Sequence, residues 1–491
     1  MLYVGFKMSR FHALAFLLTS LSWVSYVGPT HALTLKEAIG IALESNPTIL
    51  SAGENKEAVE FELRQARGLY LPTIDLEGST GFQRLNTPGR RSLGSSLGQA
   101  GDTLLPNDVN LVVRQTIFDG GDRRSQVERQ AARVDGASFR VAERSEAIAL
   151  SVAQQYIEIL LQQQIIEASR QNISILNRIL GDINRAVAGG SGTRADTTQG
   201  RERLLAARAN LKQAQQGHVE ARARFKQLVG VHFSSPARLG SIRRFIPASL
   251  SEAVRRAKKQ NSRISAVAAD IDSADAEVNG TRSVFLPRIE AEVRGAFGDD
   301  TGGSEGFTRD LQGRLVARWN LYRGGRDVAR RQELIRRADE QRTNLLSAHR
   351  EVEESVRLAW NSREKQTELH AVRRKQAAAN AQIVSSYRSQ FQVGERSLLD
   401  LLNAQNTRFN SEILTKTTKY ASIYGGFQVL GAMGGLVDAL SLSPIGQSEA
   451  YARKEFNVEP TQSKHTFKKL PSRQIAGDAI DLLAPLLKKS N

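Results

Sequence analysis

The sequence contains no cysteine among its 491 residues. It therefore forms no disulfide, offers no thiolate to a metal and provides no cysteine nucleophile; it also lacks the residue that an N-terminal lipid anchor requires. Aromatic residues make up only 6% of the chain, and two long stretches, 123–187 and 327–392, contain no proline. This balance favours long solvated helices over one large compact core.

Long apolar runs are also scarce. Apart from residues 11–27, no stretch is long and apolar enough to span a bilayer as a helix. Lys7 and Arg10 precede this run, and small residues follow it up to Ala32, which is the pattern of a secretory signal with cleavage after Ala32. A retained membrane helix is the alternative, but the apolar run is short for one. We expect an exported protein that crosses a membrane, if at all, by another structure.

The formal net charge of +17 raises nucleic acid and anionic membrane surfaces as partners. The lysines and arginines are interleaved with glutamate and glutamine along the predicted helices, without a dense basic block. Mixed runs of this kind are typical of solvated helix faces. We therefore predict no nucleic-acid partner.

A helix-to-strand switch occurs twice. A polar, helix-patterned run stops at Leu71-Pro72 and again at Leu286-Pro287, and alternating apolar and charged residues follow each proline. Proline disfavours helix for the residue before it, so Pro72 and Pro287 mark the change of conformation. The two prolines are 215 positions apart, and the spacing from Asn46 to Asn261 is the same. A constant offset predicts an internal twofold repeat.

Each switch leads into two alternating segments joined by a loop rich in Gly, Ser or Asn, so each repeat contains one β-hairpin. One reading is a half-solvated antiparallel sheet of a soluble protein. The other is a transmembrane barrel, whose strands need about 9–11 residues. Four strands cannot close a barrel, because single-chain barrels use about eight or more. The membrane reading therefore requires several chains to pool their strands.

Each hairpin ends in a Gly-Gly turn, Gly120-Gly121 and Gly324-Gly325, 204 positions apart. A proline-free run of about 65 residues then predicts a helix of roughly 100 Å, which is typical of a coiled coil or tube. Both long helices break at related turns around Gly190 and Gly394, again 204 apart, and a return helix follows each.

These patterns predict the following organisation. Residues 1–32 form a signal peptide; 33–230 form the first repeat, with a β-hairpin at 72–119 and a helical hairpin at 121–229; 231–248 form a linker; 249–435 form the second repeat, with a β-hairpin at 287–322 and a helical hairpin at 324–430; and 436–491 form a polar C-terminal tail. We expect no compact fold in the tail, in which 475–487 is patterned as a short amphipathic helix.

Together these features resemble the TolC family of outer-membrane efflux and secretion channel proteins, over about residues 33–435. No single motif carries the resemblance; the order and spacing of all of them do. It implies an α+β membrane protein in which three chains build a barrel of twelve strands, four from each chain. A long α-helical barrel then continues through the periplasm.

The resemblance also implies a gate at the helical tips near Gly190 and Gly394. Arg396 occupies the position of the family's gate arginine and Asp196 that of its carboxylate partner, while Asp400 matches the first aspartate of a constriction ring. The second ring aspartate is Asn403 here, and the gate tyrosine is Phe391. From the residues alone, charges that stabilise helix N-termini are the better explanation of Asp196 and Asp400; the resemblance favours the gate.

The resemblance implies a passive exit duct for tripartite efflux pumps, type I protein secretion or both, in the bacterial outer membrane. Its partners would be two further copies of the chain, a periplasmic adaptor (membrane fusion) protein, an inner-membrane transporter of the RND or ABC type, and outer-membrane lipid. Drugs, detergents, bile salts or polypeptides would pass through it. The alternative is a periplasmic coiled-coil adaptor or structural protein with no channel, which would not need the alternating strands.

An exported enzyme is the third reading. The seven histidines are scattered, and the sequence contains no H-E-x-x-H pair or evident nucleophile–base set. The Gly-Gly turns lack the Lys-Ser/Thr ending of a phosphate-binding P-loop. We predict a protein that is not an enzyme and has no cofactor, no metal site and no catalytic residues.

Overall fold

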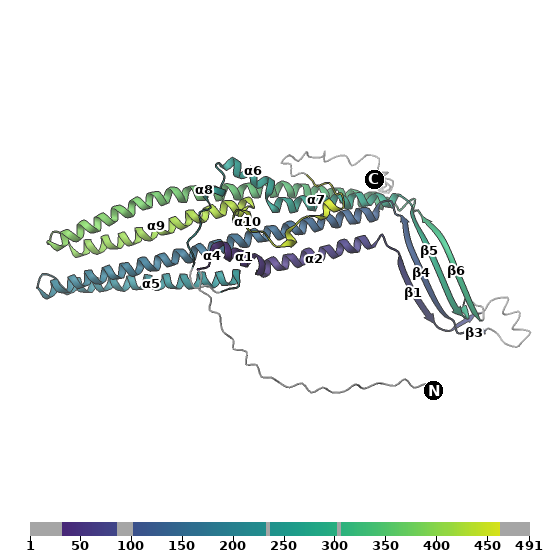
Figure 1. The fold of residues 1–491 in the computed structure, drawn as a ribbon, viewed down its shortest axis with the longest axis horizontal. Coiled ribbons are helices and arrows are strands. Elements are labelled where there is room, and N and C mark those ends of the chain that lie inside the picture. Colours follow the sequence, from purple (N-terminus) through teal and green to yellow (C-terminus); the bar gives the residue numbers. More distant parts are fainter. Residues whose placement is uncertain (1–31, 86–101, 232–235, 302–305, 462–491) are drawn as a thin grey trace, which may run out of the picture.

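The computed structural model describes residues 32–85, 102–231, 236–301 and 306–461. Helices form a long rod, and a curved sheet extends from one end of it (Figure 1). The predicted signal segment lies outside the described residues apart from Ala32. Within the part of the chain that is described, no helix combines the length and the apolar character needed to cross a membrane.

The first repeat begins with two short helices and ends in a helical hairpin. Its elements are α1 (Leu35–Ser45), α2 (Pro47–Gly68), β1 (Thr73–Thr80), β2 (Gln83–Leu85), β3 (Asp102–Leu104), β4 (Asn107–Phe118), α4 (Asp122–Ala188) and α5 (Arg194–Val229). Thr34 caps α1 through a capping box with Glu37, and Asn46 caps α2 by accepting the Thr48 N–H. The helix boundaries therefore follow directly from local capping chemistry.

The second repeat has the same two short helices, two long strands and helical hairpin in the same order, without a counterpart of β2 and β3. The elements are η1 (Arg243–Phe245) in the linker, then α6 (Leu250–Gln260), α7 (Ser262–Gly280), η2 (Thr281–Phe285), β5 (Arg288–Asp299), β6 (Phe307–Arg318), α8 (Arg326–Gln392) and α9 (Leu398–Met433). The two long helices have the same length of 67 residues, and both return helices have 36. The predicted twofold repeat is confirmed.

Equivalent side chains also make equivalent bonds. Asn46 donates to the carbonyl of Leu228 at 2.8 Å, and Asn261 donates to that of Ala432 at 3.1 Å. Asn261 lies 215 positions after Asn46, and Ala432 lies 204 after Leu228. Each asparagine thus ties a short N-terminal helix of its repeat to the end of the return helix.

Four strands form one antiparallel sheet in the order β1-β4-β5-β6, while β2 and β3 form a separate pair. One face of the larger sheet is apolar, and it is not buried against the helices: Leu311 and Leu315 are 81% and 70% exposed. A soluble half-solvated sheet packs its apolar face on a core. The exposed face therefore favours the membrane reading over the soluble one.

The other face of the sheet carries a row of alternating charges across all four strands. Asp75 of β1 pairs with Arg114 of β4 at 2.7 Å, and Arg114 pairs with Glu292 of β5 at 3.3 Å. Glu292 in turn pairs with Arg314 of β6 at 2.6 Å. Charged residues thus fill one face, as expected where strands alternate between lipid and a polar interior.

The switches are built as the sequence predicts. Before Pro287, Leu286 has extended backbone angles, φ −113° and ψ 155°, as the residue before proline prefers. Gln115 donates to the carbonyl of Tyr70 at 3.1 Å, and its equivalent Trp319 donates to that of Phe285 at 3.2 Å. Each returning strand therefore holds the end of the helical segment that precedes its partner strand.

Both Gly-Gly turns require glycine. Gly120 and Gly121 have φ values of 66° and 90°, and Gly324 and Gly325 have 65° and 78°. These left-handed conformations are costly for residues with a Cβ. Gly121 and Gly325 are the N-caps of α4 and α8, so each turn sets the direction in which a long helix leaves the sheet.

The C-terminal prediction is wrong for residues 436–461, for which the sequence indicates no compact fold. This segment contains α10 (Leu436–Ala439), η4 (Gly446–Ser448) and α11 (Ala452–Glu455), and it packs along the helices. Leu436, Val437 and Ala452 are almost fully buried. Scattered apolar residues find partners on three helices at once, which a local pattern does not reveal. The predicted helix at 475–487 lies outside the described residues.

Candidate functional site

The two helical hairpins end in matched tips. The α4–α5 turn passes through Gly190 at φ 80°, and the α8–α9 turn passes through Gly394 at φ 82°. Thr193 caps α5 in a capping box with Asp196, and Ser397 caps α9 by accepting the Asp400 N–H. Both predicted gate aspartates therefore sit in the first turn of a return helix.

The tips pack against each other through an apolar cluster formed by α4, α5 and α9. Phe391 lies at the edge of this cluster, partly buried, beside Tyr387. Its buried members are Leu176, Ile179, Ile183, Leu204, Ala207, Leu398, Leu401 and Leu402. The cluster holds the hairpins of one chain together, so the tip residues have fixed positions relative to one another.

Arg396 is held within its own hairpin. Its Nε donates to Oε1 of Gln390 at 3.2 Å, its Nη1 lies 3.9 Å from a carboxylate oxygen of Asp400, and its guanidinium lies 4.3 Å from the Tyr387 ring centroid. Asp196 instead accepts from the Thr193 hydroxyl at 2.8 Å. Among the described residues, no hydrogen bond or ion pair joins Asp196 to Arg396. One chain alone does not bring the predicted lock together.

Two polar links between the hairpins were missed by sequence reasoning. Arg203 of α5 donates to Asn403 of α9 at 3.3 Å, and Gln405 donates to Asn172 of α4 at 2.8 Å in a buried position. Asn172 lies on the same helix face as Leu176 and Ile179, and a polar residue on an apolar stripe is a signal that could have identified it. Arg203 has no such local signal.

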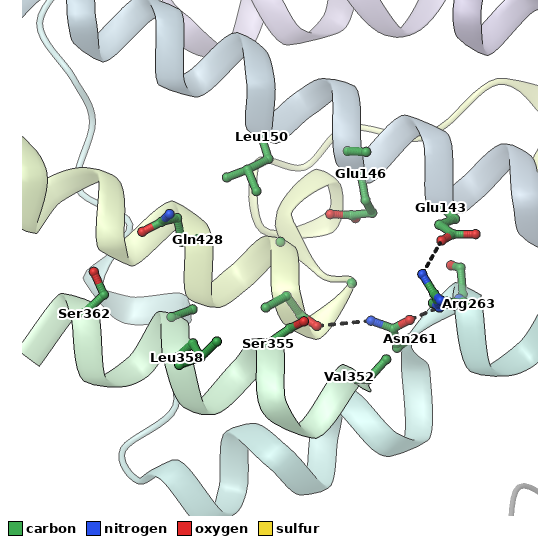
Figure 2. A pocket seen from close by; sticks show the side chains of 16 residues that line it. Glu143, Glu146, Leu150, Asn261, Arg263, Val352, Ser355, Leu358, Ser362 and Gln428 are labelled. Carbon is green, nitrogen blue, oxygen red and sulfur yellow. Dashed lines mark hydrogen bonds and ion pairs between the residues drawn. The ribbon is translucent and has the colours of Figure 1, made fainter. Parts of the chain in front are cut away.

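A cleft of about 560 Å³ lies at mid-length, between α4, α7, α8 and α9 (Figure 2). Glu146 points into it from α4, and its carboxylate accepts the N–H groups of Leu436 and Val437 at 3.0 and 3.1 Å. Burial raises the pKa of Glu146 to about 7, against the lowering effect of these two hydrogen bonds. The cleft is therefore where the C-terminal segment attaches to the rod.

No group of three or more histidine, aspartate or glutamate side chains that could hold a metal occurs in the described ranges. The geometry instead combines a helical rod with converging tips, a sheet with an exposed apolar face, and two unpaired strand edges. Such an arrangement can form a conduit between compartments when several copies assemble.

The family model described as "Outer membrane efflux protein" matches residues 38–231 and 253–421. The chain belongs to this family. It is 23% identical to the outer membrane efflux protein BepC of Brucella suis over 436 residues, which cover 88% of this chain and 91% of BepC. It is 27% identical to the outer membrane protein TolC of Escherichia coli over 184 residues, covering 37% and 36% of the two chains.

The fold agrees with this membership. The outer membrane channel CmeC of Campylobacter jejuni superposes with a TM-score of 0.72 at 16% identity, covering 86% of this chain and 89% of CmeC. The resemblance to TolC channels and the predicted fold class are therefore confirmed. At this identity the likeness concerns the fold and leaves the role of each tip residue a prediction.

Proposed function

We propose that this protein is an outer-membrane exit duct, with its helical rod in the periplasm. Membership of the outer membrane efflux family supports this function. The single observation that carries it is the sheet, whose exposed apolar face opposes a row of ion pairs. In a barrel the apolar face would contact outer-membrane lipid and the charged face would line a water-filled passage.

The duct requires a homotrimer. Strands β1 and β6 each have one unpaired edge within the chain, and an open edge is not tolerated in lipid. Three copies supply twelve strands and close the sheet without an edge. The rods of the three chains would then enclose the periplasmic part of the passage.

The gate belongs to the same proposal. Because Arg396 bonds inside its own hairpin and Asp196 caps its own helix, the lock between them would form between neighbouring chains. Three copies of Asp400 around the axis would make a ring that attracts cations. Asn403 lies one turn further along α9, and Phe391 lies near the end of α8, before the tip turn. A partly exposed lock of this kind is worth about 0–1 kcal/mol for each pair, so a partner can open it.

Transport through the duct would be passive. An inner-membrane transporter of the RND or ABC type would supply energy, and a periplasmic adaptor would dock on the helical tips and dilate them. The cargo would be small molecules such as drugs, detergents and bile salts, or polypeptides in type I secretion. A coiled-coil adaptor without a channel is the second candidate, but it leaves the four-stranded sheet without a role.

Single-channel recording tests the duct. The purified full chain, reconstituted in planar bilayers, should form long-lived pores of one conductance class and run as a trimer in light scattering. A variant that replaces Leu311 and Leu315 of the apolar face by serine should insert poorly while keeping its helical content. A soluble monomer without conductance would exclude the duct and leave the adaptor.

A further inference from the structure

The internal repeat is kept residue by residue in the sheet. Thr73 of β1 faces Arg114 of β4, and the equivalent residues Arg288 of β5 and Arg318 of β6 face each other in turn. The ion pair of Asp75 with Arg114, at 2.7 Å, also has its equivalent in Glu290 with Arg318, at 2.5 Å. Adding 215 to a β1 residue and 204 to its β4 partner thus gives a pair of residues that face each other in β5 and β6.

Within the sheet, the pairing of β4 with β5 joins the first repeat to the second. Arg114 makes its second ion pair along this junction, with Glu292 at 3.3 Å. At the end of β4 next to the helical rod, Gly120 is packed so closely that a Cβ would lie 3.0 Å from Cβ of Leu286. By the repeat, β6 is equivalent to β4 and β1 to β5, so the equivalent pairing would join the second repeat of one chain to the first repeat of another.

We propose that β6 of one chain pairs with β1 of a second copy in the register that places Arg318 opposite Glu77 of that copy. Applying the two offsets to β4 and β5 gives this register, because Arg318 is equivalent to Arg114 and Glu77 to Glu292. The same operation places Gly324 against Leu71 of the neighbouring copy, as Gly120 lies against Leu286. This inference rests on the proposed trimer and specifies its seam.

The edges of the chain carry the groups that this seam needs. Glu77 makes no hydrogen bond or ion pair with any residue that the structure describes, whereas its equivalent Glu292 pairs with two arginines. The Arg318 side chain is 61% exposed although it pairs with Glu290. Leu71 is 68% exposed, and a Cβ on Gly324 would meet nothing within 4 Å. The residues that would form the seam are therefore accessible on both edges of the chain.

Cysteine cross-linking tests the register, and the cysteine-free chain is a clean background. Val113 faces Val293 in β4–β5, so Ala317 should face Gly78 of the next copy, within reach of a disulfide. The Ala317→Cys/Gly78→Cys variant should give covalent dimers and trimers on mild oxidation in membranes. The matched Leu315→Cys/Gly78→Cys variant, displaced by two residues, should remain largely unlinked.

The register would be wrong if disulfides formed only in the displaced variant, or in neither variant while the trimer forms. Either result would leave the proposed exit-duct function uncontradicted. Failure of the unmodified chain to form a trimer would instead contradict the proposed function. The two failures are therefore distinguishable by light scattering of the same preparations.

The glycine contact gives a second, independent test. Gly324→Ala should reduce the fraction of trimer, because the new methyl group meets Leu71 of the neighbour. Gly325→Ala has the same left-handed backbone, φ 78° against 65°, and no neighbour within 4 Å; its equivalent Gly121 is equally open. It therefore controls for backbone strain. Equal trimer fractions in the two variants would show that Gly324 does not lie against Leu71 of the neighbouring copy.

Discussion

Nη1 of Arg453 lies 2.6 Å from Oδ2 of Asp272. The same guanidinium lies 2.8 Å from Asp135, whose carboxylate also accepts the backbone N–H groups of Ala452 and Arg453. Asp135 comes from α4 and Asp272 from α7, so one arginine of the C-terminal segment joins the two repeats. All three charged side chains are at most 9% exposed.

Replacing Arg453 by methionine should destabilise the protein strongly. Removing one member of a buried ion network leaves the others uncompensated, at a cost of about 3–5 kcal/mol. Thermal unfolding followed by helical circular dichroism should show a large fall in Tm, and 436–461 should become sensitive to trypsin. Arg67→Met breaks an exposed pair with Glu455 at 3.8 Å and should cost about 0–1 kcal/mol. Similar losses of stability in the two variants would show that the ion pairs of Arg453 with Asp135 and Asp272 do not hold the C-terminal segment in place.

Gly120→Ala should be more damaging than Gly121→Ala. Both residues have positive φ, which costs an alanine about 1–2 kcal/mol. Only at Gly120 would the new Cβ also collide, at 2.9 Å from Cα of Ser283 and 3.0 Å from Cβ of Leu286, adding about 1–3 kcal/mol of strain. Urea unfolding of the two variants measures the difference, and equal midpoints would show that this close approach relaxes without cost.

Protonation of Glu146 should make stability depend on pH. Burial raises the pKa of Glu146 from 4.5 to about 7, so between these values the folded state binds more protons than the unfolded chain. The free energy of unfolding should therefore fall as pH rises through this window, by at most about 3 kcal/mol, and then level off.

Glu146→Gln keeps a carbonyl acceptor for one of the two N–H groups of Leu436 and Val437 and removes the titration. Its Tm should vary less between pH 5 and pH 7 than that of the unmodified protein. Glu143→Gln removes a half-exposed carboxylate from the same helix and should keep the original pH dependence. An unchanged slope in Glu146→Gln would assign the pH dependence to other groups.

The proposed lock should limit conductance. Arg396→Ala and Asp196→Ala should each raise the single-channel conductance of the purified trimer, because the closed tips would lose a polar link. Arg185 lies near the α4–α5 tip, as Asp196 does, but pairs with Asp182 on its own helix, so Arg185→Ala should leave conductance unchanged. If all three variants conduct alike, Arg396 and Asp196 do not form the lock.

Asp400 should govern block by cations. Three carboxylates at a narrow ring bind multivalent cations more tightly than one, so Asp400→Ala should weaken block by such ions added at the tip side. Asp182→Ala removes a carboxylate from outside the proposed ring and serves as the control. An unaltered block in Asp400→Ala would place the constriction elsewhere.

Much of the fold could be predicted because it depends on neighbours in sequence. Thr34, Asn46 and Thr193 start helices by capping N–H groups a few residues away, and Pro72 and Pro287 act on the residue before them. The alternation of apolar and charged residues likewise assigns each strand residue to a face. The repeat offset then relates one half of the chain to the other.

The partners of the tip residues could not be predicted in this way. Arg203 and Asn403 are 200 positions apart, and nothing near either of them specifies the other. The resemblance pairs Arg396 with Asp196, but within the chain a partner four residues away, Asp400, is the carboxylate beside it. The packing of 436–461 escaped prediction for the same reason, since its contacts lie on α2, α4 and α9.

The sequence by itself determined where the long helices and the four long strands lie, and that the chain is a twofold repeat, because capping, proline geometry and periodicity act over a few residues. Only the tertiary structure decided which carboxylate each arginine meets. An ion pair depends on the relative placement of two elements, and that placement is set by packing along the whole rod. Arg453, enclosed by Asp135 and Asp272 from two different repeats, is therefore visible only in the folded chain.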